Sequence, residues 1–200
     1  MTQIIPTTEL QAVNIMLSMI GEAPVNTITG VTNVDVSVAK NILDETSMSV
    51  QSQGWNFKTG DNKVGTIDDD SKIPLASNII QVDANVTNFR YMNIVFRDGF
   101  LYDLDKDTDI FTTAPTIDIV TVEPFETIPE YARRYITAQA ARRFAARFVG
   151  AGDIVKFAQQ DESDALINLQ QSDARSGDVN LLEGDANTFS IINRTPRRTY

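Results

Sequence analysis

Two of the residues most often used in catalysis, cysteine and histidine, are absent from this 200-residue chain. Without cysteine, the chain cannot form a disulfide, a thiolate nucleophile or a cysteine-ligated metal site. Without histidine, it cannot form a Ser-His or Cys-His nucleophile or a histidine-bound zinc site. Any acid–base chemistry would therefore need carboxylates or lysines with shifted pKa values. Several enzyme classes are excluded, but carboxylate-based hydrolases are not.

Long apolar runs, glycine-rich phosphate loops and an excess of basic residues are also lacking. No run of about eighteen apolar residues occurs, so no membrane-spanning helix and no membrane partner is expected. Neither Gly-x-x-x-x-Gly-Lys nor Gly-x-Gly-x-x-Gly occurs, and no cofactor is predicted. The net charge is −10, which disfavours nucleic-acid binding because phosphate contacts need lysine and arginine. An acidic wall could still line a passage through which DNA moves without sticking.

Apolar residues recur at helical spacing at both ends of the chain, which predicts four helices. The expected helices span residues 8–20, about 35–53, 127–149 and about 153–176. Thr8 with Gln11, and Thr127 with Glu130, have the spacing of capping boxes, and Asp153 can cap the last helix. On the second helix the face expected to be buried consists of Ala39, Ile42, Leu43, Thr46 and Val50.

The helical period fades between residues 59 and 126, where short β-favouring runs alternate with turn residues. These runs cover residues 63–67, 79–82, 93–96, 100–104 and 117–123. Asp98-Gly99 between two of them predicts a tight hairpin, because these residues accept a positive φ. The predicted fold is α+β, with a four-helix bundle-like domain (1–58 plus 127–176). A small antiparallel β domain (59–126) is inserted, and an irregular C-terminal tail (177–200) follows.

The third expected helix carries five of the chain's arginines. They are Arg133, Arg134, Arg142, Arg143 and Arg147. On a helical wheel, Arg134 and Arg142 fall on the mostly apolar side. The group could be a solvated basic face with snorkelling stems, an intersubunit surface, or a phosphate site. The acidic residues Asp161 and Glu162 on the fourth helix are candidate partners, within the chain or between subunits.

Two aspartate clusters are candidate cation sites. Asp68-Asp69-Asp70 does not have the spacing of a calcium loop. The alternating aspartates from Asp103 to Asp109 have Thr108 and Ala114 where a calcium loop needs its glycine and its glutamate. No metal site is therefore predicted.

Several segments resemble the tail tubular protein A family of short-tailed bacteriophages (podoviruses). The segments that carry the resemblance are Ala12-Val13-Asn14, Ile20-Gly21-Glu22-Ala23-Pro24-Val25, Gln51-Ser52-Gln53-Gly54-Trp55-Asn56-Phe57, Pro129-Glu130 followed by Arg133, Arg142, Phe144, Arg147-Phe148 and Gly150-Ala151, and Asn180-Leu181-Leu182-Glu183-Gly184-Asp185-Ala186. They lie in both helical halves and in the tail, in the family's order. Residues 60–125 match only in general character.

The resemblance implies a structural head-to-tail adaptor and no catalytic, cofactor or metal residues. Members of this family form a twelve-fold ring between the portal protein and the tail nozzle, tail tubular protein B. The genome passes through the ring without sequence-specific binding. The chain would assemble in the host bacterial cytoplasm and reside in the virion tail.

This role needs contacts between subunits and contacts with other tail proteins. The residues expected at the subunit interface are Arg133, Arg134, Arg142, Arg147, Asp161 and Glu162. Those expected to dock the tail onto a partner are Leu181, Leu182, Arg194, Arg197 and Arg198. Two alternatives remain open from the residues: a carboxylate-based peptidoglycan or glycan hydrolase that assists entry, and a generic protein-binding module. A close pair of buried acids in a cleft would favour the hydrolase.

Overall fold

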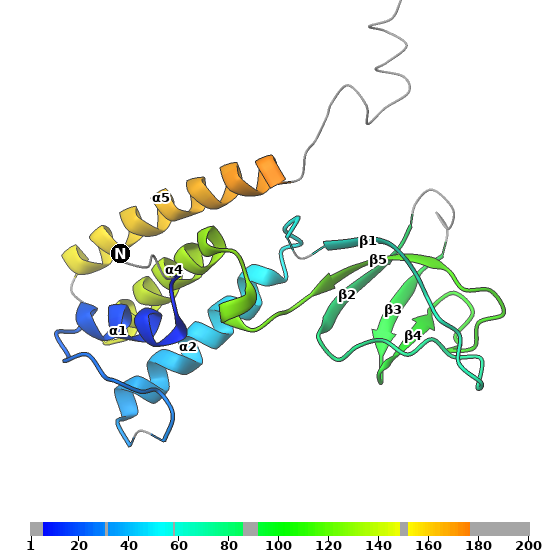
Figure 1. The fold of residues 1–200 in the computed structure, drawn as a ribbon, viewed down its shortest axis with the longest axis horizontal. Helices are drawn as coiled ribbons and strands as arrows, with labels where there is room; N and C mark the ends of the chain where they lie inside the picture. Colours follow the sequence, from blue (N-terminus) through cyan, green and yellow to red (C-terminus); the bar gives the residue numbers. More distant parts are fainter. Residues whose placement is uncertain (1–5, 31, 58, 86–91, 149–151, 177–200) are drawn as a thin grey trace, which may run out of the picture.

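The chain folds into an elongated α+β structure, with the helices at one end and the strands at the other (Figure 1). The computed structural model describes residues 6–30, 32–57, 59–85, 92–148 and 152–176. Its elements are α1 (Glu9–Met19), α2 (Val34–Gln51), β1 (Thr59–Val64), β2 (Ile79–Ala84), β3 (Ile94–Arg97), β4 (Phe100–Asp103), β5 (Thr116–Thr121), the short 3₁₀ helix η1 (Phe125–Thr127), α4 (Glu130–Phe148) and α5 (Gly152–Ser176). The predicted α+β class is confirmed.

Local capping explains where α1 begins and ends. The Thr8 side chain accepts a hydrogen bond from the Gln11 backbone N–H, and the Gln11 side chain accepts one from the Thr8 N–H, so the predicted capping box is confirmed. At the other end Gly21 has a φ of +79°. The N–H groups of Gly21 and Glu22 donate to the carbonyls of Ser18 and Leu17, which completes a Schellman motif.

The start of α4 differs from the prediction, because Thr127 does not form a capping box with Glu130. Thr127 belongs to η1, and its hydroxyl donates to the Pro124 carbonyl at 2.8 Å. Glu130 is already the first residue of α4, and its carboxylate accepts hydrogen bonds from Thr7 instead. Asp153 likewise lies inside α5, which begins at Gly152, and not at its cap.

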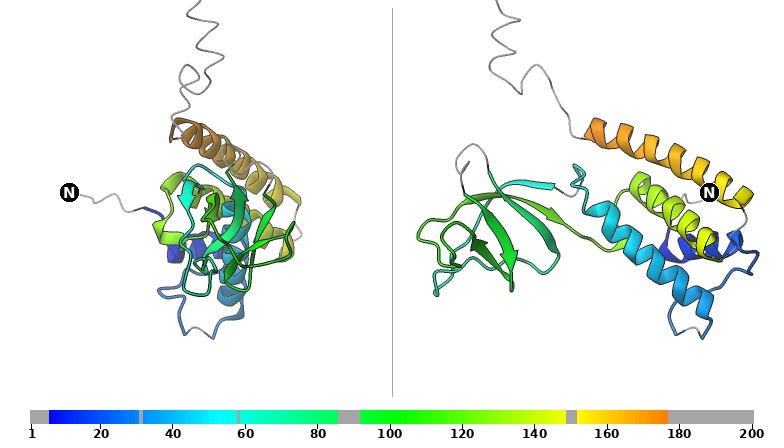
Figure 2. Two further views of the ribbon diagram at one scale, coloured as in Figure 1. Left: turned by 90° about the vertical axis from the view of Figure 1, so that its right-hand side faces the viewer. Right: turned by 180° about the vertical axis from the view of Figure 1, so that it is seen from behind.

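Helix α4 packs against each of α1, α2 and α5, and the three views agree on this arrangement (Figures 1 and 2). All five residues expected on the inner face of α2 are buried, as predicted. The residues of this helical core that are at most 1% exposed are Ala12, Val13, Met16, Leu17, Val36, Ala39, Ile42, Leu43, Val50, Ile128, Ala132, Ile136, Ala140, Phe144 and Leu169. Burial of this apolar surface holds the helices together.

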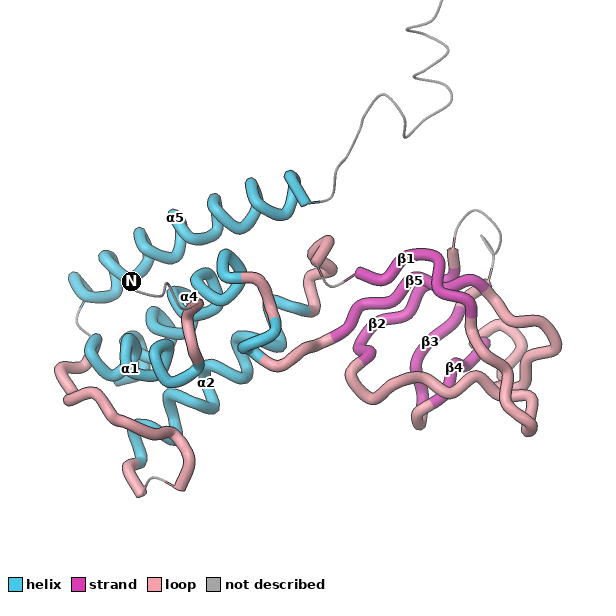
Figure 3. Tube along the Cα trace, in the orientation of Figure 1, coloured by secondary structure: helices cyan, strands magenta, loops and turns pink. Residues whose placement is uncertain are grey.

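The strands form a three-stranded antiparallel sheet in the order β1-β5-β2 and a β3–β4 hairpin (Figure 3). In the hairpin turn Asp98 has a φ of +50° and Gly99 a φ of +87°, so the predicted tight turn is confirmed. The predicted position of the first strand is wrong, because β1 runs over Thr59–Val64 and not over residues 63–67. Its position is fixed by pairing with β5, from Thr59 opposite Val120 to Val64 opposite Thr116.

The strands have a hydrophobic cluster of their own, separate from the helical core. Its buried members are Ile73, Ile79, Val82, Ile94, Leu101, Phe111 and Ile117. Two chain segments connect the helical end to the strand end, one from α2 to β1 and one from β5 to η1 (Figure 1). The chain thus has two separately packed ends.

Candidate assembly surface

The arginines of α4 fall into three structural groups, beginning with Arg133. Its guanidinium donates to three backbone carbonyls, those of Ile128 at 2.7 Å, Thr7 at 3.0 Å and Glu126. These bonds join the N-terminal segment, η1 and the first turn of α4. Arg133 is therefore hydrogen-bonded within its own chain, and it holds the N-terminal segment and η1 against the start of α4.

Arg142 forms the second group, a polar network between α4 and α5. Its guanidinium forms an ion pair with the Glu162 carboxylate, which also accepts a hydrogen bond from the Gln139 side-chain amide at 3.1 Å. Gln139 Nε2 also donates to the Tyr135 hydroxyl at 3.1 Å. The hydrogen bond to Glu162 raises the pKa of Arg142, and burial raises the pKa of Tyr135. The network lies in a part-buried seam and holds α5 on α4.

The remaining arginines of α4 are more exposed or make looser contacts. Arg134 pairs with Glu130 at 2.9 Å, yet 73% of its side chain is exposed. Arg147 is 3.7 Å from Glu45, and both side chains are more than half exposed. Arg143 donates to the Thr46 hydroxyl at 3.3 Å. Exposed ion pairs such as those of Arg134 and Arg147 contribute little stability, so these two arginines can exchange partners at low cost.

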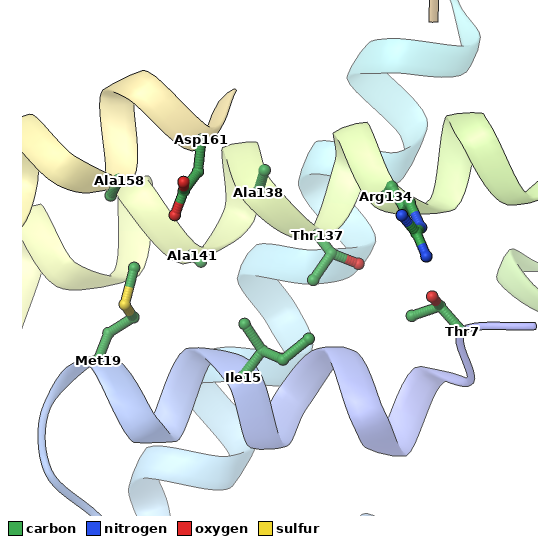
Figure 4. Close-up of a pocket in the computed structure, with 9 residues that line it drawn as sticks. All are labelled: Thr7, Ile15, Met19, Arg134, Thr137, Ala138, Ala141, Ala158 and Asp161. Atoms are coloured by element: carbon green, nitrogen blue, oxygen red, sulfur yellow. The ribbon is translucent and has the colours of Figure 1, made fainter. Parts of the chain in front are cut away.

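A groove of about 340 Å³ lies where α1, α4 and α5 meet (Figure 4). We call it the α1–α4–α5 groove. It is lined by Thr7, Ile15, Met19, Arg134, Thr137, Ala138, Ala141, Ala158 and Asp161. Small alanines on α4 and α5 leave the hollow, and the larger Ile15 and Met19 border it from the side of α1 (Figure 4). Arg134 and Asp161 add one charge of each sign.

The groove continues into a second hollow along α4 and α5, which also contains Arg134 and Asp161. Its other lining residues are Glu130, Tyr131, Asp164, Ala165, Asn168 and Ser172. Ile15 is 45% exposed, which is high for an isoleucine. An apolar hollow bordered by charged side chains has the character of a protein-binding surface.

The structure brings together some of the residues predicted at the interface and separates others. Arg134 and Asp161 line the same groove, whereas Arg142 and Glu162 pair with each other across α4 and α5. The expected docking residues Leu181, Leu182, Arg194, Arg197 and Arg198 lie outside the described residues. Sequence reasoning missed Ile15 and Met19, although an isoleucine off the apolar face of α1 was a signal for Ile15.

The acidic clusters show no sign of a catalytic or metal centre in the described part of the chain. No group of three or more acidic residues there could hold a metal ion. The buried carboxylates of that part are Asp103, the last residue of β4, and Asp173 near the end of α5. Asp103 accepts bonds from the backbone of Asp105 and Lys106 and from the Lys106 ammonium, and these lower its pKa although burial alone would raise it. The close pair of buried acids that would favour a hydrolase is not found among the described residues.

Comparison with known proteins places the chain in a family. A family model described as "Tube: Tail tubular protein" matches residues 10–179, which include every helix and strand named above except the first residue of α1. No match was found among curated proteins. Among the helices of the described residues, none combines the length and the apolar character that a membrane span requires. Tail tubular proteins are structural components of bacteriophage tails, and the chain belongs to this family.

Proposed function

We propose that this chain is the head-to-tail adaptor of a short-tailed bacteriophage. In this role several copies form a ring between the portal protein and the tail nozzle, and the genome passes through the ring. The observation that carries the proposal is the family match over residues 10–179. Ring formation follows when one face of a subunit binds a different face of the next and the rotation closes.

The elongated shape supports different contacts for the two ends of the chain. We assign subunit contacts and the portal side to a helical domain (1–58 plus 127–176), and the nozzle side to an inserted β domain (59–126). Each end has its own hydrophobic core, so each can present a surface to a different partner. The tail, residues 177–200, would dock on a neighbouring tail protein through its leucines and arginines.

The charged residues of the helical end divide into two roles under this proposal. Arg142 with Glu162 holds α5 on α4, and Arg133 with its carbonyls holds the N-terminal segment and η1 at the start of α4. Arg134, Arg147 and Asp161 are exposed and reach the neighbouring subunit. Arginine suits such contacts because its planar guanidinium pairs with two oxygens of a carboxylate.

The overall charge fits a passage for DNA. A chain with a net charge of −10 repels the duplex, so an assembled wall of such chains would let the genome slide without binding its sequence. The proposal involves no cofactor and no membrane.

Negative-stain imaging of the chain mixed with the portal protein of the same phage tests the proposal. We expect a ring of added density at one end of the portal, with the portal alone as the control. Portals that never acquire this density, over a series of salt concentrations, would contradict the adaptor role.

A further inference from the structure

Helix α2 carries an outer face that is exposed and partly apolar. Val34 is 70% exposed and Met48 is 57% exposed, and the two lie fourteen residues apart, which is close to four helical turns. They therefore project from the same side of α2, opposite its buried stripe. Asp44 lies one turn before Met48, and Lys40 one turn before Asp44.

This outer face and the α1–α4–α5 groove lie on opposite sides of the helical end. In Figure 4 the groove opens between α1, α4 and α5, and α2 passes behind α4. The buried stripe of α2 faces the shared core, so its exposed stripe faces away from the groove. A contact between these two surfaces must join different copies of the chain, and it leaves one groove and one α2 face free for further copies.

The two surfaces carry complementary charges, and each has an apolar part. The groove offers an apolar hollow between Ile15 and Ala141, and methionine is flexible enough to fill an irregular hollow. The groove also holds a cation and an anion, Arg134 and Asp161. The α2 face offers an anion and a cation near Met48, namely Asp44 and Lys40, which pair with each other at 2.5 Å; Lys40 also pairs with Glu9 of α1 at 2.8 Å.

We propose that the α1–α4–α5 groove of one copy binds the outer face of α2 of the next copy. Met48 enters the hollow beside Ile15, Asp44 faces Arg134, and Lys40 faces Asp161. The ion pairs that these residues make within the chain, Lys40 with Asp44 and with Glu9 of α1, and Arg134 with Glu130, are replaced or extended by pairs between copies. This inference rests on the proposed ring and specifies which faces form it.

The absence of native cysteine allows a direct cross-linking test. We would combine Ile15→Cys with Met48→Cys, assemble the variant on the portal, and add a short bis-maleimide. The expected product is a ladder of covalent multimers, whereas either single-cysteine variant should give no ladder. The matched control pairs Met48→Cys with Val64→Cys, which replaces a residue of β1 that is 69% exposed and outside the groove.

The outcomes separate this inference from the adaptor role. If the unmodified chain forms multimers on the portal but the Ile15–Met48 pair cross-links no better than the control, the inference is wrong and the adaptor role stands. If the unmodified chain forms no multimer with the portal, both are wrong.

A charge exchange tests the polar part of the contact independently. Arg134→Glu alone, or Asp44→Arg alone, should weaken assembly at least about tenfold, because each places like charges opposite one another. The double variant should recover most of the loss, since the pair is restored with its signs reversed. Circular dichroism would verify that each variant is folded. A double variant that assembles no better than the two single variants would overturn the proposed pairing.

Discussion

The ion pair between Arg142 and Glu162 should contribute to the stability of a single chain. Only 13% of the Glu162 side chain and 33% of the Arg142 side chain are exposed, so water can replace their interaction only in part. A hydrogen bond to a charged group contributes about 1.5–3 kcal/mol. We therefore expect Glu162→Gln to lower the free energy of unfolding by about 2 kcal/mol, which is about 4–8 °C in Tm for a chain of this size.

A double-mutant cycle with Arg142→Met measures the interaction itself. Thermal unfolding followed by circular dichroism should show that the double variant loses less than the sum of the single variants. The expected coupling is about 1–2 kcal/mol. The control is Arg134→Met, whose exposed pair with Glu130 should contribute under about 1 kcal/mol. Additive losses for Arg142 and Glu162 would refute the intramolecular pair, and the prediction that both residues lie at the subunit interface would then stand.

Three further changes test the local structure. Burial alone would raise the pKa of Glu130, but hydrogen bonds from Thr7 and Arg134 lower that pKa below its ordinary value of 4.5. The ionised Glu130 carboxylate therefore stabilises the fold fully above pH 4.5, and this stabilisation is lost as the pH falls through the lowered pKa. Urea unfolding at decreasing pH should therefore show a smaller acid loss for Glu130→Gln than for the unmodified chain, and equal losses would contradict this. Phe144→Ala, at a fully buried position, should cost about 3–5 kcal/mol in urea unfolding, and a loss under about 1 kcal/mol would show that the core is misassigned. Gly99→Ala should cost about 1–2 kcal/mol from its φ of +87° alone, because no atom lies near the added Cβ, and an unchanged Tm would contradict that turn.

The features that sequence predicts well are those set by near neighbours. The capping box of Thr8 and Gln11 uses residues three apart, and the hairpin turn at Asp98 and Gly99 depends on two residues that accept a positive φ. The inner face of α2 follows from helical spacing alone. In each case the deciding interaction lies within a few residues.

The features for which the prediction from sequence is wrong depend on contacts between residues that lie far apart in the chain. Strand β1 lies where β5 pairs with it, although Gly60, Asp61 and Asn62 have low β propensity. Glu130 matches a capping box by spacing, but its carboxylate is taken by Thr7, which is 123 residues away. A helical wheel puts both Arg134 and Arg142 on the apolar side of α4. The tertiary structure distinguishes them, because Arg142 pairs with Glu162 whereas Arg134 remains exposed.

The central claim is that copies of this chain join the portal as a ring, and the mass of the complex tests it most directly. Native mass spectrometry of the portal with and without the chain counts the copies, each of which has a mass of 22.2 kDa. The account predicts a complete complex heavier than the portal by twelve times this mass. Portal that gains no mass at any salt concentration, or gains only a single copy, would contradict it.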